Sequence, residues 1–130
     1  MRRPAREGVR SGSPFESTIG FSRAVRIGTR VLVSGTAPVW PDGSCPDDAG
    51  IQANRCFEII GSALAELGAG FGDVVRTRVY LVDAGDAGAV GRAHAAAVGS
   101  AAPAASMVIV AGLLDPRWRV EIEAEAEVGR

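Results

Sequence analysis

The sequence is poor in the residues that most often build metal sites and covalent catalytic sites. It has one histidine, His94, and two cysteines, Cys45 and Cys56. These cysteines form no CxxC pair and show no zinc-ligand spacing, so the sequence predicts no metal site and nothing favours a cysteine–histidine nucleophile. The glycines of segment 61–72 lack the Walker and dinucleotide spacings, and no bound cofactor is predicted. Separated cysteines indicate free thiols, which are typical of a cytoplasmic protein.

Excess charge and long apolar runs are also missing. The formal net charge is −1 at pH 7, which gives no electrostatic basis for a nucleic-acid partner. No apolar run approaches the roughly 20 residues that a membrane span needs. What the chain does have is 47% hydrophobic residues in a length of 130, which predicts one folded domain. We expect residues 1–13 to form a flexible N-terminal arm and residues 14–130 to form the domain.

Apolar periodicity predicts a mixture of strands and helices. Alternating apolar residues predict strands over residues 21–27, 30–34, 74–82, 107–111 and 120–128. Apolar residues three to four positions apart predict a helix over 51–67, capped by Asp48 and ended at Gly68, and the alanine-rich segment 86–98 predicts another. The order ββαβαββ predicts an α/β (α+β) domain in which one mixed sheet carries both helices on one face.

The predicted strands have distinct faces. In the strand over 74–82, alternation places Val75 with Thr77 on one face and Val74 with Arg78 on the other. In the last strand, apolar residues alternate with a row of carboxylates: Glu121, Glu123, Glu125 and Glu127. A row of four carboxylates cannot be buried without partners. We therefore expect it to face solvent or to meet the available arginines, Arg76, Arg78, Arg117 and Arg119.

Several segments resemble the YjgF/RidA family of small imine deaminases. The similar segments are residues 31–38 (VLVSGTAP), 52–55 (QANR), 73–83 (DVVRTRVYLVD), and the closing pair 103–110 and 119–124. They follow the family order over about residues 14–128. The resemblance implies a YjgF-like, chorismate-mutase-like fold. It also implies a homotrimer with ligand clefts between the subunits, and hydrolysis of a small imine or enamine.

The resemblance further implies site residues, and this chain departs from the family at several of them. Ser34 and Gly35 match the family's substrate-holding segment, and Glu121 matches the glutamate that positions water. The departures, with the usual family residue in brackets, are Phe21 (tyrosine), Gly91 (asparagine), Ala105 (arginine) and Met107 (cysteine). The family arginine holds the substrate carboxylate with two hydrogen bonds. The chain therefore resembles a divergent branch that lacks this arginine.

Other polar residues are candidates to replace what is missing. Arg78 or Arg23 could hold a carboxylate, although Arg78 could instead neutralise the glutamate row. His94 titrates near neutrality and could protonate an imine nitrogen, or it could be an ordinary half-exposed residue of a helix. Glu16, in the loop before the first predicted strand, could join the site or be solvated.

The sequence thus favours a hydrolase (deaminase) with Glu121 and His94 as catalytic residues. The expected substrate-binding residues are Ser34, Gly35, Phe21, Arg78, Glu16, Ala105 and Met107. One alternative is a trimer of the same fold that binds a small metabolite or regulates a partner protein without turnover, which fits the altered positions. A lesser alternative, ribonuclease or translation inhibition, comes from older family names. The near-neutral charge and the single histidine give it no physical basis.

Overall fold

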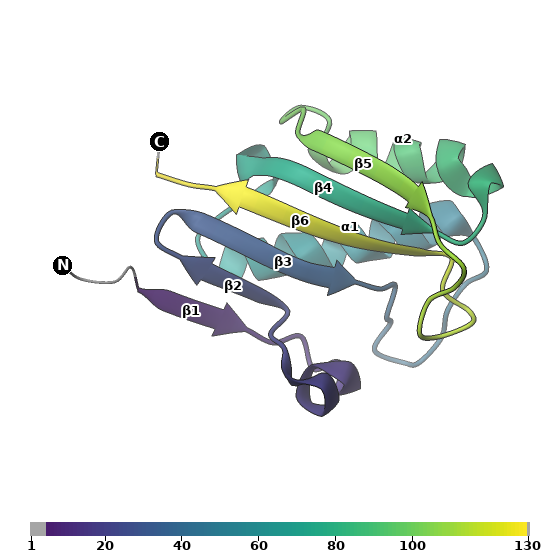
Figure 1. The fold of residues 1–130 in the computed structure, drawn as a ribbon, viewed down its shortest axis with the longest axis horizontal. Helices are drawn as coiled ribbons and strands as arrows, with labels where there is room; N and C mark the ends of the chain where they lie inside the picture. The colour runs from purple at the N-terminus through teal and green to yellow at the C-terminus, as the bar shows by residue number, and fades with distance from the viewer. Residues whose placement is uncertain (1–4, 130) are drawn as a thin grey trace.

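The computed structural model describes residues 5–129, which form a single α+β domain with one six-stranded mixed sheet and two main helices (Figure 1). The strands are β1 (Arg6–Val9), β2 (Ala24–Ile27), β3 (Arg30–Thr36), β4 (Val74–Leu81), β5 (Ala104–Ile109) and β6 (Val120–Glu127). The helices are α1 (Ala49–Glu66) and α2 (Ala87–Val98), with short helical turns at Glu16–Gly20, Phe71–Asp73 and Ala84–Asp86. Both main helices lie behind the sheet in Figure 1, as predicted.

The strand order across the sheet is β1-β2-β3-β6-β4-β5. Neighbouring strands are antiparallel except β4 and β5, which are parallel and joined through α2. The last strand, β6, lies between β3 and β4, so the two closing strands of the chain are not neighbours. This central position places the start of β6 beside the end of β3, where the candidate site forms.

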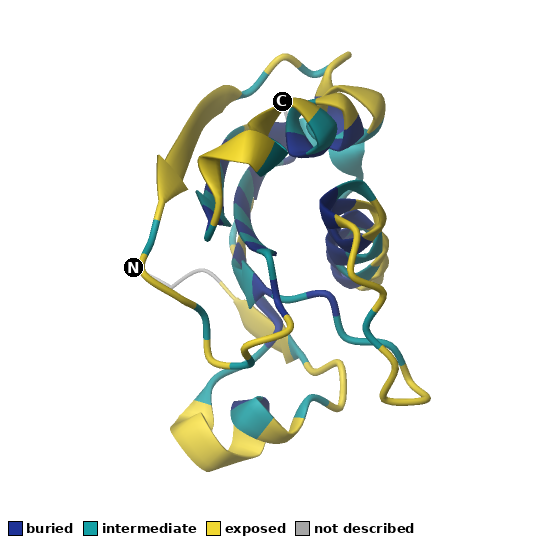
Figure 2. Ribbon diagram, turned by 90° about the vertical axis from the view of Figure 1, so that its right-hand side faces the viewer, coloured by how far each residue is buried: buried dark blue, intermediate teal, exposed yellow. Residues whose placement is uncertain are grey.

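The core lies between the sheet and the helices, where the buried residues of Figure 2 face one another. Residues of β6 alternate between buried and half-buried along the whole strand, which confirms the predicted alternation. Its buried side packs against α1, which contributes the fully buried Ile60 and Leu64.

The predicted ends of α1 are confirmed. The Ile51 backbone N–H donates to the side chain of Asp48, which is the N-cap of the helix. Gly68, just past the last turn, has a φ of +78°. This left-handed conformation suits glycine and ends the helix.

Part of the predicted flexible arm is a strand. Residues 6–9 form β1, which pairs antiparallel with β2 and extends the predicted sheet by one strand. Residues 1–4 of the predicted arm lie outside the described residues. Strand β5 also differs from its prediction, because it begins at Ala104 rather than at residue 107 and ends at Ile109.

The predicted faces of β4 are correct except at its start. Val74 is 2% exposed and Val75 is 46% exposed, the reverse of the prediction. The pairing of β4 with β6 shifts register between Val74 and Arg76. The shift marks a β-bulge, which places an extra residue in one strand and interrupts strict alternation.

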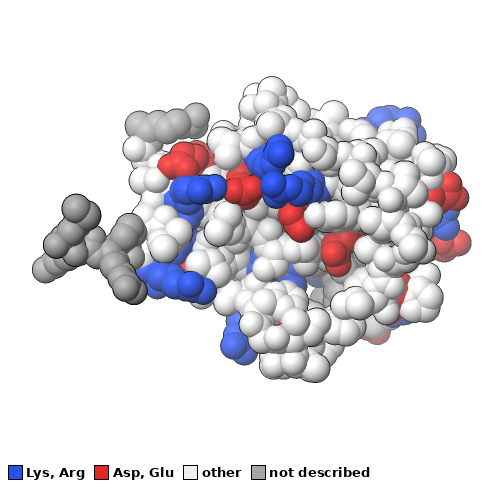
Figure 3. All heavy atoms as spheres, in the orientation of Figure 1, with Lys and Arg blue, Asp and Glu red and all other residues white. Residues whose placement is uncertain are grey.

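The glutamate row lies on the sheet face opposite the helices, which Figure 3 shows with arginines and glutamates side by side. Arg78 lies 3.3 Å from Glu125 and 3.5 Å from Glu123. Arg30, which the sequence analysis did not include, lies 2.7 Å from Glu125. The expectation that Arg78 neutralises the row is confirmed.

Two other predicted partners of the row are wrong. Arg117 pairs with Asp115, and Arg119 pairs with Asp47 and Asp86. Both arginines precede β6, so they meet acidic residues of the loops rather than those of the sheet.

No helix within the described residues is long and apolar enough to cross a membrane.

Candidate functional site

A cavity of about 700 Å³ lies at the end of the sheet where β3 ends and β6 begins. Its walls come from residues 11–21, the loop after β3, one side of α1 and the turn before β6. The rings and charged groups that line it are Phe15, Phe21, Trp40, Trp118, Arg23, Arg55, Glu121 and Glu123. A largely apolar hollow with a few convergent charges has the size and composition of a small-molecule site.

Glu121, near the start of β6, contributes a carboxylate to the wall of the cavity. A Cβ placed at Gly35 would lie 2.8 Å from Glu121 Oε2, so the side chain of Glu121 lies directly against the Gly35 backbone. No residue in the described part of the chain donates a hydrogen bond to this carboxylate. Burial raises the pKa of Glu121, and Glu123 raises it further while Arg23 opposes the shift.

Arg23 contacts the Gly35 backbone and is only 5% exposed. Its Nη1 donates to the Gly35 carbonyl at 2.6 Å and to Thr36 Oγ1 at 3.0 Å. Its Nε donates to Glu16 Oε2 at 3.3 Å, and the centroid of the Phe21 ring lies 5.3 Å from Cζ. These contacts fix the guanidinium in the cavity wall.

Glu16 is 1% exposed and does not line the cavity, so the alternative of a solvated carboxylate is wrong. It accepts hydrogen bonds from the Ser11 backbone N–H at 3.0 Å, from the Ser11 hydroxyl and from Arg23. Burial opposes ionisation, but the bonds from Ser11 and Arg23 outweigh it and lower the pKa of Glu16. Glu16 therefore holds the segment 11–21 against Arg23.

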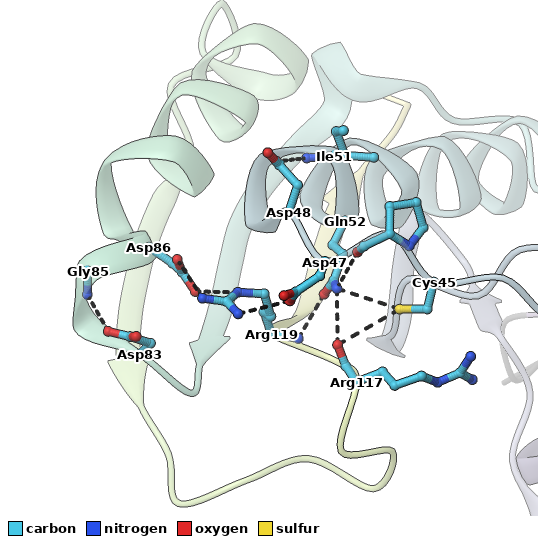
Figure 4. A network of polar contacts seen from close by, with 11 residues as sticks. Cys45, Asp47, Asp48, Ile51, Gln52, Asp83, Gly85, Asp86, Arg117 and Arg119 are labelled. Carbon is cyan, nitrogen blue, oxygen red and sulfur yellow. Dashed lines mark hydrogen bonds and ion pairs between the residues drawn. The ribbon is translucent and has the colours of Figure 1, made fainter.

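Gln52, in the first turn of α1, holds the loops beside the cavity together (Figure 4). It is fully buried, and its Nε2 donates to the carbonyls of Pro46 at 2.8 Å and Arg117 at 3.0 Å. Its Oε1 accepts from the Arg119 backbone N–H at 2.7 Å. One side chain thus joins the loop after β3 to the turn before β6, and these are the segments that carry Trp40 and Trp118.

His94, the predicted general acid, lies on α2 and does not line the cavity. Its Nε2 shares a hydrogen bond of 2.7 Å with Thr77 Oγ1, and its ring packs edge-on against Phe57. Burial lowers its pKa. Because Thr77 faces the helices, His94 is enclosed between α2 and the sheet and does not meet Glu121 in this cavity.

Three further predicted residues are also outside the cavity. Ala105 and Met107 are exposed on β5, which is the sheet edge two strands away from β6. Arg78 borders a second, smaller hollow on the face with the glutamate row. Of the predicted set, the structure brings together Phe21, Ser34, Gly35 and Glu121; the hydroxyl of Ser34 already donates to the Ser22 carbonyl at 2.7 Å.

Several lining residues, two of them on α1, were not predicted from the sequence. Arg55 and Ile59 of α1 both line the cavity, and their spacing of one helical turn was the available signal. The Nε of Arg55 also donates to the Val39 carbonyl at 2.8 Å, which ties α1 to the loop after β3. Within residues 5–129, no three histidine, cysteine or acidic side chains gather as a metal site would require.

A family model, a solved structure and sequence relatives all place the chain among the same group of proteins. A family model described as Endoribonuclease L-PSP matches residues 12–128. The chain is similar to a solved member of the YjgF/YER057c/UK114 family from Mycobacterium tuberculosis, with 45% identity, 95% of this chain and 100% of that chain covered, and a TM-score of 0.87. It is 41% identical to a Streptomyces coelicolor protein called uncharacterized, over 93% of this chain and 91% of that protein. It is 32% identical to a mouse 2-iminobutanoate/2-iminopropanoate deaminase, over 84% of this chain and 82% of that protein.

Proposed function

The chain belongs to the endoribonuclease L-PSP family, which includes the YjgF/RidA proteins, and from that membership we propose that it hydrolyses a small imine or enamine to a carbonyl compound and ammonia. The observation that carries this proposal is Glu121. Its carboxylate is part-buried, has a raised pKa and accepts no hydrogen bond from the described residues. A carboxylate held in this way at a cavity wall is suited to accept and return a proton.

The proposed reaction needs water and one proton-transfer group. Ionised Glu121 accepts a proton from a water molecule, and at the same time the oxygen of that water forms a bond to the carbon of the protonated imine. Protonated Glu121 then returns that proton to the nitrogen of the carbinolamine. As the carbon–nitrogen bond breaks and ammonia leaves, ionised Glu121 takes the proton of the carbinolamine hydroxyl, so the carbonyl compound remains. That proton then passes to the released ammonia, which departs as ammonium.

The composition and the burial of the cysteines argue against covalent catalysis and favour direct attack by water. Every basic side chain counted in the 14 lysines and arginines is an arginine, so the chain has no lysine for a Schiff base with a carbonyl substrate. Burial raises the pKa of both cysteine thiols, which weakens each of them as a nucleophile. Glu121 is left as the group best placed to handle protons.

We also propose that the chain forms a homotrimer, as proteins of this family typically do. The support is the exposed apolar surface of β5 and the open sheet face, formed by Ile27, Leu32, Val75, Met107, Val108 and Ile109. In such an assembly Ala105 and Met107 would approach the cavity of a neighbouring subunit. Ala105 would then mark a branch without the family's substrate-binding arginine.

The test is a coupled assay for ammonia or carbonyl release over a panel of imino acids and enamines. We expect the wild type to hasten hydrolysis, and Glu121→Gln to lower kcat/KM by about 10² to 10⁴-fold. Glu123→Gln is the matched control, because Glu123 also lines the cavity but already pairs with Tyr80 and Arg78. A wild type that accelerates no substrate, while a thermal-shift screen still finds ligands, would contradict the hydrolase and favour the metabolite-binding trimer.

A further inference from the structure

Arg23 has hydrogen-bond donors that the protein does not use. Its Nε and both hydrogens of Nη1 are taken by Glu16, Gly35 and Thr36. Its Nη2 has no hydrogen-bond partner in residues 5–129. Every fully buried polar side-chain atom in those residues does have a partner, so Nη2 is not fully buried. Nη2 therefore keeps contact with solvent. Because Arg23 lines the cavity, we assign that contact to the cavity side.

The position of Arg23 is fixed before any ligand arrives. The buried ion pair with Glu16 and the two bonds from Nη1 hold the guanidinium plane, and the Phe21 ring packs beside it. An arginine held in one orientation loses little conformational entropy on binding an anion. Arg55 adds a second positive charge to the same cavity wall.

The rest of the cavity suits an apolar group. Phe15 and Trp118 pack edge to face with ring centroids 5.9 Å apart, and Trp40 and Leu114 also line the hollow. A cavity of about 700 Å³ is large for a substrate with only a methyl or ethyl side chain. The rings therefore favour a substrate with a bulky apolar side chain.

We infer that Arg23 binds the substrate carboxylate from within the same protomer, and that the substrate is an imino or enamino acid with a bulky apolar side chain. This inference rests on the proposed hydrolase function and names the residue that recognises its substrate. Arg23 thereby takes the task that the resemblance assigns to the position of Ala105. Because Arg23 and Glu121 both contact Gly35 and line the same cavity, a carboxylate on Nη2 brings the reacting carbon of such an acid toward Glu121.

The experiment compares the binding of phenylpyruvate, a product-like 2-oxo acid, with the binding of its neutral amide by calorimetry. We expect the wild type to bind the acid about tenfold more tightly or better, as a charge-assisted hydrogen bond would give. In Arg23→Lys the acid should bind about tenfold less tightly while the amide is unaffected. Arg26→Lys is the matched control, because Arg26 is on β2, also bonds backbone carbonyls and lies outside the cavity.

Equal affinities for acid and amide in the wild type would overturn the inference, as would an acid preference that survives Arg23→Lys. Circular dichroism checks the fold of each variant. If Arg23→Lys does not fold, Arg55→Lys and Arg78→Lys decide: the acid preference should persist in both, and its loss in either would assign the carboxylate to that residue instead. Acid-selective binding without turnover would refute the hydrolase and leave Arg23 as the anion-binding residue. Hydrolysis of the imino acid and of its amide at equal rates would support the hydrolase and refute Arg23 as the carboxylate-binding residue.

Discussion

The turn around Glu16 and the start of β6 around Glu121 each place a carboxylate near the guanidinium of Arg23. Glu16 is bonded by Ser11 and Arg23, and its pKa is lowered. Glu121 has no hydrogen-bond donor in the described residues, and its pKa is raised. The same type of side chain thus has a structural role where its oxygens accept hydrogen bonds, as in Glu16. Where they are left open to a cavity, it is available for chemistry.

The largest stability difference between the two regions should appear on removing Glu16. Glu16→Ala leaves Arg23 as a buried cation without its counter-ion, and we expect a loss of about 3–5 kcal/mol. Urea unfolding at fixed protein concentration measures it. Glu58→Ala is the control, because Glu58 pairs with Arg55 on the exposed side of α1 and should cost under about 1 kcal/mol. Equal losses in the two variants would show that the Glu16–Arg23 pair is not structural.

The next effect concerns the close approach at Gly35. A Cβ at this position would lie 2.8 Å from Glu121 Oε2, so Gly35→Ala must displace the carboxylate. We expect kcat/KM to fall by up to about 10²-fold, because small displacements of a catalytic group are costly. Gly72→Ala is the control, since no atom lies within 4 Å of its added Cβ. Activity unchanged by Gly35→Ala would separate Glu121 from the reaction.

The opposite pKa shifts give opposite pH dependences of stability. The raised pKa of Glu121 means that its contribution is present below the ordinary value of 4.5 and is lost as the pH rises through the higher folded value. Glu121→Gln should therefore be more stable than the wild type at neutral pH. The contribution of Glu16 is present above 4.5 and is lost as the pH falls through its lower folded value. Unfolding free energies of the wild type, Glu121→Gln and Glu16→Gln across pH 3–8 test both signs.

The smallest effect on stability is expected at the exposed edge strand. Ala105 is exposed on β5, so Ala105→Arg should change the free energy of unfolding by under about 0.5 kcal/mol. If Ala105 meets a neighbour's cavity in a trimer, the variant should gain activity on 2-imino acids with small side chains. A coupled assay beside the wild type measures this. No change in either substrate preference or rate would argue that β5 does not reach the site.

Much of the fold was predictable because each element carries a strong local signal. The alternation of β6, the helical spacing and caps of α1, and the existence of strands β2 and β3 all followed from side-chain periodicity and capping chemistry. The errors arose where neighbours override local pattern. The bulge at Val74 and Val75 depends on pairing with β6, and β1 forms only because β2 offers it an edge.

The candidate site was predictable only in part. Phe21, Gly35 and Glu121 line one cavity. His94 does not join them, because it is held beneath α2, where Thr77 engages its ring. Nothing in the spacing of Glu16 and Arg23 tells which charges will be paired inside the protein.

The sequence by itself determined the family, the layered α+β architecture and the alternation that points Glu121 away from the core, because these depend on local pattern along one chain. Only the tertiary structure decided which carboxylate is satisfied and which stays open. That choice depends on distances among Ser11, Glu16, Arg23, Gly35 and Glu121, which separate elements bring together. Hydrogen bonding and burial act over a few ångströms in space, and the order of residues in the chain does not record those distances.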